Sequence, residues 1–369
     1  MKVVILGGGI AGLCMGIYLH QHHIEVSVNE RQVFAAVGGH AFLMHHDGIA
    51  VLKELIGEQD CAMPGRVVDT FIFRDPGGQV VTEQHLPDWH CFKRTDLLEC
   101  LRELIPAAKL IDNRIFSHFI YEGTKIIAAA FRNGDIEYGD LFIGADGANS
   151  AVRKAVLGEV VFQPGKVKEV VGIARHQQLA QTFKGRFIKF QHPAKGLSFG
   201  MIPTSEAEVV WFMQYDPSAG DVPEDDEQRS SEKYPELIRD LCLNNLADFP
   251  AEVQQILKEN DFTTSYIWNT RDFDLLPAFH HENVVLIGDA AHVALPFTSA
   301  GTTNAMVDAK VLMESLLKNK DMHLAFKDYY RIRSVPIAHH VKLGRELRDA
   351  FLNPSAMFAL PLITAQVND

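Results

Sequence analysis

The stretch that decides the fold is MKVVILGGGIAGLCMGIYLHQHHIEVSVNE, residues 1–30. Its apolar character admits two interpretations: a targeting segment, or the first strand and helix of an α/β domain. A targeting segment is disfavoured because Lys2 is the only basic residue before the apolar run, three glycines interrupt that run, and no small-residue cleavage site follows. The second interpretation predicts a buried β-strand over 3–7 and a helix that begins after the glycines.

The spacing of the glycines assigns a physical role to each of them. Gly7, Gly9 and Gly12 fit the pattern G-x-G-x-x-G between the predicted strand and helix. The first allows a tight turn, the second lets a diphosphate approach the backbone, and the third lets the helix pack against the strand. Free N–H groups at the start of the helix, around Ile10 and Ala11, then face the diphosphate.

A second predicted strand, 25–30, ends in Glu30, which lies 23 positions after Gly7 (30 − 7). A carboxylate at this place accepts hydrogen bonds from the hydroxyls of an adenosine ribose, whereas a 2′-phosphate would meet its negative charge. The first thirty residues therefore predict a site for FAD or NAD rather than NADP, and they leave the choice between FAD and NAD open.

Composition narrows the class of protein. The chain has 369 residues, a net charge of −12 and a pI of about 5.8. Its length predicts two interlocked lobes, and its acidity disfavours nucleic acid and anionic membranes as partners. Five cysteines without a C-x-x-C pair favour a reducing, cytoplasmic location. The apolar stretch at 356–365 contains Pro361 and is too short for a membrane span, which needs ~20 residues.

Two further segments end a predicted strand in glycine and aspartate. The segment LFIGADGANSAVR (141–153) contains Asp146, which can cap the following helix or serve a ligand. The segment VVLIGDAAHVALP (284–296) contains Gly288 and Asp289 at the end of a strand, where α/β folds bind ligands. His292 is a candidate for either a functional or a structural role. Adjacent histidine pairs such as 45–46 cannot face one way, so no metal site is expected.

These motifs resemble the class A flavoprotein monooxygenases, the para-hydroxybenzoate hydroxylase-like family. The likeness covers the N-terminal glycine pattern, KRTDLLECL (93–101), 141–158 and 284–309, and it extends weakly over 329–347. The resemblance implies a tightly bound, non-covalent FAD and NAD(P)H as a transient co-substrate. It implies cofactor contacts for Gly7, Gly9, Ile10, Ala11, Gly12, Glu30, Arg31, Gly39, Arg94, Asp146, Gly288, Asp289, Pro296, Gly301, Thr302 and Thr303.

The chain departs from the family pattern just before the helix expected after Gly301. The usual glycine-rich stretch reads Ser299-Ala300-Gly301, and the usual asparagine is Thr303, with Asn304 one position later. Backbone N–H groups of this helix start are expected to face the flavin's pyrimidine edge, where reduced flavin carries negative charge.

The fold class follows: α/β, with a Rossmann-like FAD-binding domain on a parallel sheet and an inserted antiparallel-sheet substrate domain. We expect the FAD-binding domain over 1–70, 93–160 and 271–369, and the substrate domain over 71–92 and 161–270. Short runs of alternating character in 185–215 predict the antiparallel sheet. Its apolar residues are candidates for a substrate pocket, with a plain core role as the alternative: Phe199, Met201, Trp211 and Met213, together with Pro296.

The resemblance implies a monooxygenase that uses NAD(P)H and O2 to hydroxylate a small aromatic or otherwise electron-rich substrate through a flavin C4a-hydroperoxide. No residue in the sequence identifies a catalytic base. One alternative is a flavin-dependent halogenase, dehydrogenase or reductase of the same superfamily, although the halogenase signature W-x-W-x-I-P is missing from the sequence. A second is a non-catalytic FAD- or NAD-binding regulator. The sequence leaves the substrate, the choice of nicotinamide, and monomer or homodimer open.

Overall fold

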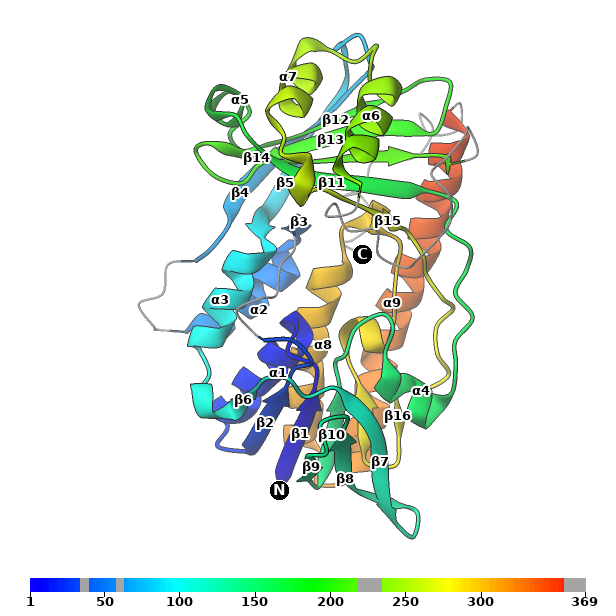
Figure 1. The fold of residues 1–369 in the computed structure, drawn as a ribbon. Helices are drawn as coiled ribbons and strands as arrows, with labels where there is room; N and C mark the ends of the chain where they lie inside the picture. Colours follow the sequence, from blue (N-terminus) through cyan, green and yellow to red (C-terminus); the bar gives the residue numbers. More distant parts are fainter. Residues whose placement is uncertain (34–39, 58–62, 218–233, 355–369) are drawn as a thin grey trace.

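The computed structural model describes residues 1–33, 40–57, 63–217 and 234–354. In these residues the chain forms two large sheets, with sheet A at the bottom of Figure 1 and sheet B at the top. The lower one, sheet A, is parallel except for its first strand, and β1 lies next to β10 and β2. In spatial order its strands are β16 (His280–His281), β17 (Val284–Leu286), β10 (Leu141–Gly144), β1 (Lys2–Leu6), β2 (Glu25–Asn29) and β6 (Leu110–Ile111).

Sheet B, the upper sheet, is mainly antiparallel, with one parallel pair between β12 and β4. In spatial order its strands are β15 (Tyr266–Asn269), β11 (Lys168–Arg175), β14 (Glu208–Tyr215), β13 (Leu197–Pro203), β12 (Arg186–Gln191), β4 (Arg66–Arg74), β5 (Val80–Lys93) and β3 (Ala41–Met44). A third, antiparallel sheet flanks sheet A and consists of β7 (Phe116–Glu122), β8 (Lys125–Phe131) and β9 (Ile136–Tyr138).

The helices divide between the two large sheets (Figure 1). With sheet A lie α1 (Ile10–Gln21), α2 (His46–Ile56), α3 (Arg94–Glu103), α4 (Ala151–Leu157), α8 (Gly301–Lys318) and α9 (Met322–Leu352). With sheet B lie α5 (Gln177–Thr182), α6 (Pro235–Asn245) and α7 (Ala251–Glu259). Short 3₁₀ turns are η2 (Ala107–Lys109), η4 (Phe262–Thr264), η5 (Gly288–Ala290) and η6 (Pro296–Thr298). Among the described residues, no helix combines the length and apolarity needed to cross a bilayer.

The core under sheet A forms because its strands are apolar on both faces. Strand β1 is buried from Val3 to Leu6, and helix α1 is buried from Ile10 to Leu19 with little amphipathic character. A helix that is apolar all round must be enclosed, and α8, α2 and α3 surround α1. This encloses the first helix in the centre of the domain and holds its N-terminus at the carboxyl edge of the sheet.

Sheet B presents two different faces because side chains alternate along each strand. One face carries large apolar residues that pack with α5, α6 and α7 in a single hydrophobic cluster. The other face points toward sheet A and its helices, as the contact between Lys189 of β12 and the ring of Phe297 in η6 shows. The predicted fold class is confirmed, while the exact division into two domains stays a prediction; sheet B draws its strands from 41–93 and 168–269.

Candidate cofactor and active site

Three sequence motifs that are far apart in the chain meet at the carboxyl edge of sheet A. They follow β1, β10 and β17, which are neighbouring parallel strands. Gly7 has a φ of +118°, and a Cβ at this position would lie 2.2 Å from the backbone oxygen of Ala145. A Cβ on Gly288 would lie 2.9 Å from the Cβ of Ala11. The three motifs therefore form one continuous edge, as expected for a ligand laid across parallel strands.

The glycines of the first motif fit a diphosphate cradle. A Cβ on Gly12 would lie 2.0 Å from the Gly7 carbonyl oxygen, so only glycine allows α1 to pack this close to β1. By contrast, no heavy atom of the described residues lies within 4 Å of a Cβ built on Gly9. Helices α1 and α8 both begin without a side-chain hydrogen-bond cap in the described structure. Their first N–H groups are thus available to an anionic ligand.

Glu30 is buried at the end of β2, and its neighbours hold it in place. Its carboxylate accepts hydrogen bonds from the Gly8 N–H, at 2.7 Å, and the Gln32 N–H, at 3.0 Å. Its backbone is fixed between the Ile111 carbonyl and the Arg114 N–H, each at 2.9 Å. A carboxylate has about four lone-pair positions, so two stay available to ribose hydroxyls. Exposed Arg31 follows directly, whereas Gly39 lies outside the described residues.

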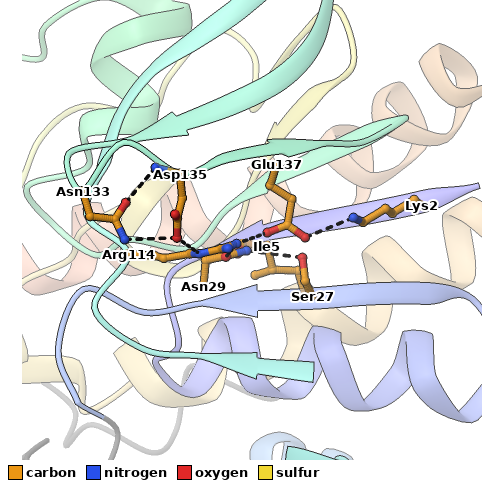
Figure 2. A network of polar contacts seen from close by, with 8 residues as sticks. All are labelled: Lys2, Ile5, Ser27, Asn29, Arg114, Asn133, Asp135 and Glu137. Atoms are coloured by element: carbon orange, nitrogen blue, oxygen red, sulfur yellow. Dashed lines mark hydrogen bonds and ion pairs between the residues drawn. The ribbon is translucent and has the colours of Figure 1, made fainter. Parts of the chain in front are cut away.

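A polar network anchors this end of β2 to the third sheet, as Figure 2 shows. The Arg114 guanidinium donates to Asn29 at 2.9 Å, to Asp135 at 3.1 Å and to Glu137. Glu137 also forms an ion pair with Lys2 at 3.2 Å. Because Asn29 directly precedes Glu30, this network fixes the end of β2 and with it the position of Glu30, the candidate for ribose binding.

The side chain of Asp146 holds the start of the helix that follows it in the second motif. One carboxylate oxygen accepts from the N–H groups of Ala151, at 2.8 Å, and Val152, at 3.1 Å, and the other accepts from the Ser150 hydroxyl. This is the capping role that the sequence left open, and a contact between Asp146 and the cofactor stays a prediction. Burial raises the pKa of Asp146, and these hydrogen bonds oppose the rise.

Arg153 is a linking residue that sequence reasoning missed, although it ends the quoted motif. Its guanidinium donates to the carbonyls of Ala148, at 2.7 Å, and Ala290, at 2.9 Å, and it lies 4.8 Å from the Phe273 ring centroid. The second and third motifs are thereby joined through one buried cation. An arginine at the start of a helix after a G-x-D-G turn was the available signal, but only the fold shows which carbonyls it reaches.

Asp289 combines solvent access with desolvation. Its side chain is exposed, yet the surrounding protein desolvates its carboxylate and raises its pKa, against the attraction of His292 and Arg94. Arg94 begins α3, and its N–H donates to the His40 carbonyl at 2.7 Å. The structure therefore brings Arg94 electrostatically close to Asp289, although the two are far apart in sequence.

A buried network supports the Gly288–Asp289 turn from α8 and α9. Asp308 accepts from the Gly288 N–H at 2.8 Å, from His292 at 2.6 Å and from Arg333 at 2.6 Å. Although burial opposes it, the positive partners and their hydrogen bonds lower the pKa of Asp308 to about 2. Arg333 also donates to Asn304 at 2.8 Å. His292 thus has a structural hydrogen bond, and Asp308 and Arg333 are site-supporting residues that the sequence analysis missed.

The departure from the family pattern before α8 has a structural account. Ser299 adopts a φ of +50°, the left-handed conformation that favours glycine. The Thr303 hydroxyl accepts from the His45 N–H at 3.1 Å and so ties the start of α8 to the segment before α2. Asn304 instead faces α9, where it contacts Arg333 and His340. Asn304 is therefore no substitute for the usual asparagine. Pro296 begins η6 and is half-buried, while exposed Gly301 and half-buried Thr302 are the first two residues of α8.

Four of the five substrate-pocket candidates have the core role that the sequence analysis gave as the alternative, and a pocket role for Pro296 stays a prediction. Phe199, Met201, Trp211 and Met213 are all fully buried in the cluster that α6 and α7 cover. The reason is the strand alternation: the larger apolar residues form the core beneath the helices. The opposite face of strands β12, β13 and β14 carries Lys189, Gln191, Ser198 and Gln214, and Lys189 approaches Phe297 of η6 from it. Helices over 235–259, which cover the apolar face, were not predicted.

Comparison with known proteins agrees with this geometry. The model of the FAD binding domain family matches residues 1–321, so the chain belongs to that family. The chain is 25% identical over 372 residues to 3-amino-4-hydroxybenzoate 2-monooxygenase of Streptomyces cremeus, covering 96% of this chain and 88% of that protein. It is 25% identical over 377 residues to FAD-dependent urate hydroxylase of Mycolicibacterium vanbaalenii, covering 95% and 88%.

The solved structures agree on the fold. HpxO of Klebsiella pneumoniae, crystallised with FAD and uric acid, superimposes with a TM-score of 0.85 at 21% identity, covering 97% of this chain and 90% of that one. The chain is accordingly a FAD-dependent monooxygenase of the para-hydroxybenzoate hydroxylase-like family, as its motifs predicted.

Proposed function

We propose that this enzyme uses NAD(P)H and O2 to hydroxylate a small, planar, electron-rich organic molecule held between sheet B and the start of α8. The observation that carries the proposal is the meeting of two surfaces. The edge of sheet A has the glycines and acids that suit FAD, and the inward face of sheet B opposite it carries buried polar groups around Lys189. Several relatives are named for oxidation of aromatic or heteroaromatic compounds, which supports this substrate class.

The residues of the cradle divide the work of holding FAD. Gly9 and the N-terminus of α1 suit the diphosphate, Glu30 suits the adenosine ribose, and Asp289 suits hydroxyls of the ribityl chain. Bound FAD would supply electron transfer from the nicotinamide and activation of O2, which is cofactor chemistry. The protein's contribution is orientation, exclusion of water and control of charge.

The start of α8 has the charge-control role in this proposal. Its first N–H groups, at Gly301 to Thr303, lie at the positive end of an eighteen-residue helix with no side-chain cap in the described structure. Helix N-termini stabilise negative charge that develops nearby. The Thr303 hydroxyl is already engaged with the His45 N–H, so these residues would act through the backbone.

The experiment is reduction and reoxidation of the purified holoenzyme. Under anaerobic conditions, NADH or NADPH should bleach the flavin's visible absorbance, faster when a suitable substrate is present. Admission of labelled O2 should then yield a product that contains one labelled oxygen atom, measured by mass spectrometry. A flavin that neither nicotinamide reduces would contradict the proposal. So would reoxidation that yields only hydrogen peroxide with a broad panel of phenols and heteroaromatic rings, and halide-dependent products would indicate halogenation.

A further inference from the structure

A row of polar side chains crosses the inward face of sheet B. Backbone pairing joins its members from strand to strand: Gln191 to Ser198, Ser198 to Gln214, Gln214 to Glu169, and Glu169 to Trp268. Within this polar row, Gln214 donates to Glu169 at 2.7 Å, and Trp268 donates to Glu169 at 3.0 Å. Buried polar groups normally form hydrogen bonds with one another, and the polar row does so across neighbouring strands of the sheet.

Lys189 lies on the same face, two residues before Gln191 on β12. Its side chain is 6% exposed, and its ammonium donates to the Gln214 carbonyl oxygen at 3.1 Å. An ammonium has three N–H donors, and among the described residues Gln214 is its one hydrogen-bond acceptor. The same nitrogen lies 5.8 Å from the Phe297 ring centroid in η6, next to the start of α8. Lys189 therefore spans from the polar row toward the proposed flavin position with donors to spare.

Three buried polar atoms without a hydrogen-bond partner among the described residues lie on the strand of Lys189, in η6 and just before α2. Gln191 is 1% exposed, and its side-chain carbonyl oxygen has no hydrogen-bond partner in the part of the chain that the structure describes. The same holds for the hydroxyl of Thr298 and for one ring nitrogen of His45, both buried. Thr298 follows Phe297 in η6. Unpaired buried polar atoms are rare because they are costly, and a ligand is one way to satisfy them.

The charge around Lys189 indicates the charge of such a ligand. Gln214 accepts a hydrogen bond from Lys189 and donates one to Glu169, so it bridges the two charged groups. The ammonium of Lys189 and the carboxylate of Glu169 therefore balance each other's charge within the polar row. Burial lowers the pKa of Lys189 to about 8, against the attraction of Glu169, which leaves it a charged donor at neutral pH. A buried anionic ligand would leave net negative charge inside the protein, whereas a neutral polar ligand would not. The balance favours a neutral ligand.

We propose that Lys189 and Gln191 select a neutral planar ring that carries a carbonyl or hydroxyl oxygen together with an N–H donor, as in a lactam. In this assignment, which rests on the proposed hydroxylase function, Lys189 donates to the ring oxygen and the Gln191 carbonyl accepts from the ring N–H. The flat ring lies against Phe187 and Phe212 of the inward face of sheet B and against Phe297 of η6. Thr298 and His45 supply further polar contacts at the flavin end.

The test measures binding of two probes to the oxidised holoenzyme. The probes are 2-quinolone, which has the carbonyl and the N–H, and N-methyl-2-quinolone, which has the carbonyl alone. Affinities come from calorimetry or from the perturbation of the flavin spectrum, without turnover. The variants are Lys189→Met and Gln191→Leu, with Met201→Leu as a matched control on the opposite face of the sheet, where it is buried beneath the helices.

Each variant has a distinct expected pattern. Lys189→Met should weaken both probes about 10- to 100-fold, because a charge-assisted hydrogen bond is lost. Gln191→Leu should weaken 2-quinolone about 5- to 10-fold and leave the N-methyl probe unchanged. Met201→Leu should change neither. Near-ultraviolet circular dichroism and flavin content establish that each variant is folded, and Lys189→Gln, which stays polar, replaces the methionine variant if that one loses its flavin.

Three results would overturn the assignment. The parent enzyme could fail to bind either probe, Gln191→Leu could weaken both probes equally, or Lys189→Met could leave both affinities unchanged. In the last two cases ordered water, rather than substrate, satisfies these atoms. Flavin reduction by NAD(P)H is measured in the same preparations. An enzyme that is reduced and hydroxylates another ring class would refute this assignment while the proposed function holds.

Discussion

A methyl group added at Gly9 should separate folding from cofactor binding. In the structure a Cβ at Gly9 meets no described atom within 4 Å, and the backbone, at φ −76° and ψ −172°, is open to alanine. Alanine is a poorer helix N-cap than glycine by about 0.5–1 kcal/mol, and it gains about 0.4–1 kcal/mol by restricting the unfolded chain. The two effects offset, so Gly9→Ala should leave the unfolding free energy of the apoprotein within about 0.5 kcal/mol of the parent.

Cofactor affinity should respond differently, because the open space at Gly9 is where the diphosphate would approach. The methyl group would hold the diphosphate away from the first N–H groups of α1. Each charge-assisted hydrogen bond is worth about 1.5–3 kcal/mol, so loss of one predicts an FAD affinity about 10- to 100-fold weaker, and loss of two predicts one about 100-fold weaker or more. Urea denaturation of the apoprotein and quenching of FAD fluorescence on binding measure the two quantities.

Gly12→Ala is the matched comparison within the same motif. Here the added Cβ would lie 2.0 Å from the Gly7 carbonyl oxygen, so helix and strand must move apart. Forced separation of packed backbone should cost about 3 kcal/mol or more of unfolding free energy, and FAD binding should fail with it. If Gly9→Ala bound FAD as tightly as the parent, the diphosphate would not pass this residue. If Gly12→Ala were as stable as the parent, the close packing of α1 on β1 would be wrong.

Three further outcomes follow from buried groups. Burial holds the pKa of His45 at about 3 and that of His340 at about 4, below the ordinary 6.5, so the unfolded chain binds more protons than the folded one in this range. Burial lowers the pKa of His40 to about 4 as well, so the three histidines together should lower the unfolding free energy by about 4 kcal/mol per unit as pH drops from 6.5 toward 4, measured by urea unfolding; His340→Gln should remove about a third of that slope. Arg333→Met, which leaves fully buried Asp308 without its guanidinium, should cost about 3–5 kcal/mol in the same assay, and a loss under about 1 kcal/mol would refute that role. Ser299→Val should cost about 1–2 kcal/mol because a β-branched residue resists a positive φ, whereas Ser299→Gly should be near neutral, and equal stability of the two would contradict the left-handed backbone.

The cofactor half of this protein was predictable from local patterns. The spacing of Gly7, Gly9 and Gly12 between a strand and a helix restricts the backbone so strongly that one geometry satisfies it. The second and third motifs each end an apolar strand, and parallel strands present their carboxyl ends at the same edge. The three motifs therefore meet because their strands are parallel neighbours in one sheet. The motif-to-family likeness added the cofactor's identity.

The substrate half depended on tertiary structure. Period-2 alternation in 185–215 predicts two faces for each strand, but it does not say which face the helices cover. The apolar side chains of these strands suggested a pocket, but in the structure α6 and α7 cover that face of the sheet. Lys189 and Gln191 belong to no sequence motif, so nothing in the sequence was a reason to select them. Lys189 became a candidate because folding buries it near Phe297, which lies more than one hundred residues later in the chain.

The sequence by itself predicted the place of a dinucleotide site, because glycine conformation and strand ends are local properties of the chain. Only the tertiary structure decided which side chains of sheet B lie opposite that predicted site. Burial, the pairing of charges and unpaired polar atoms depend on the whole set of neighbours that folding brings together, and no single segment contains that information.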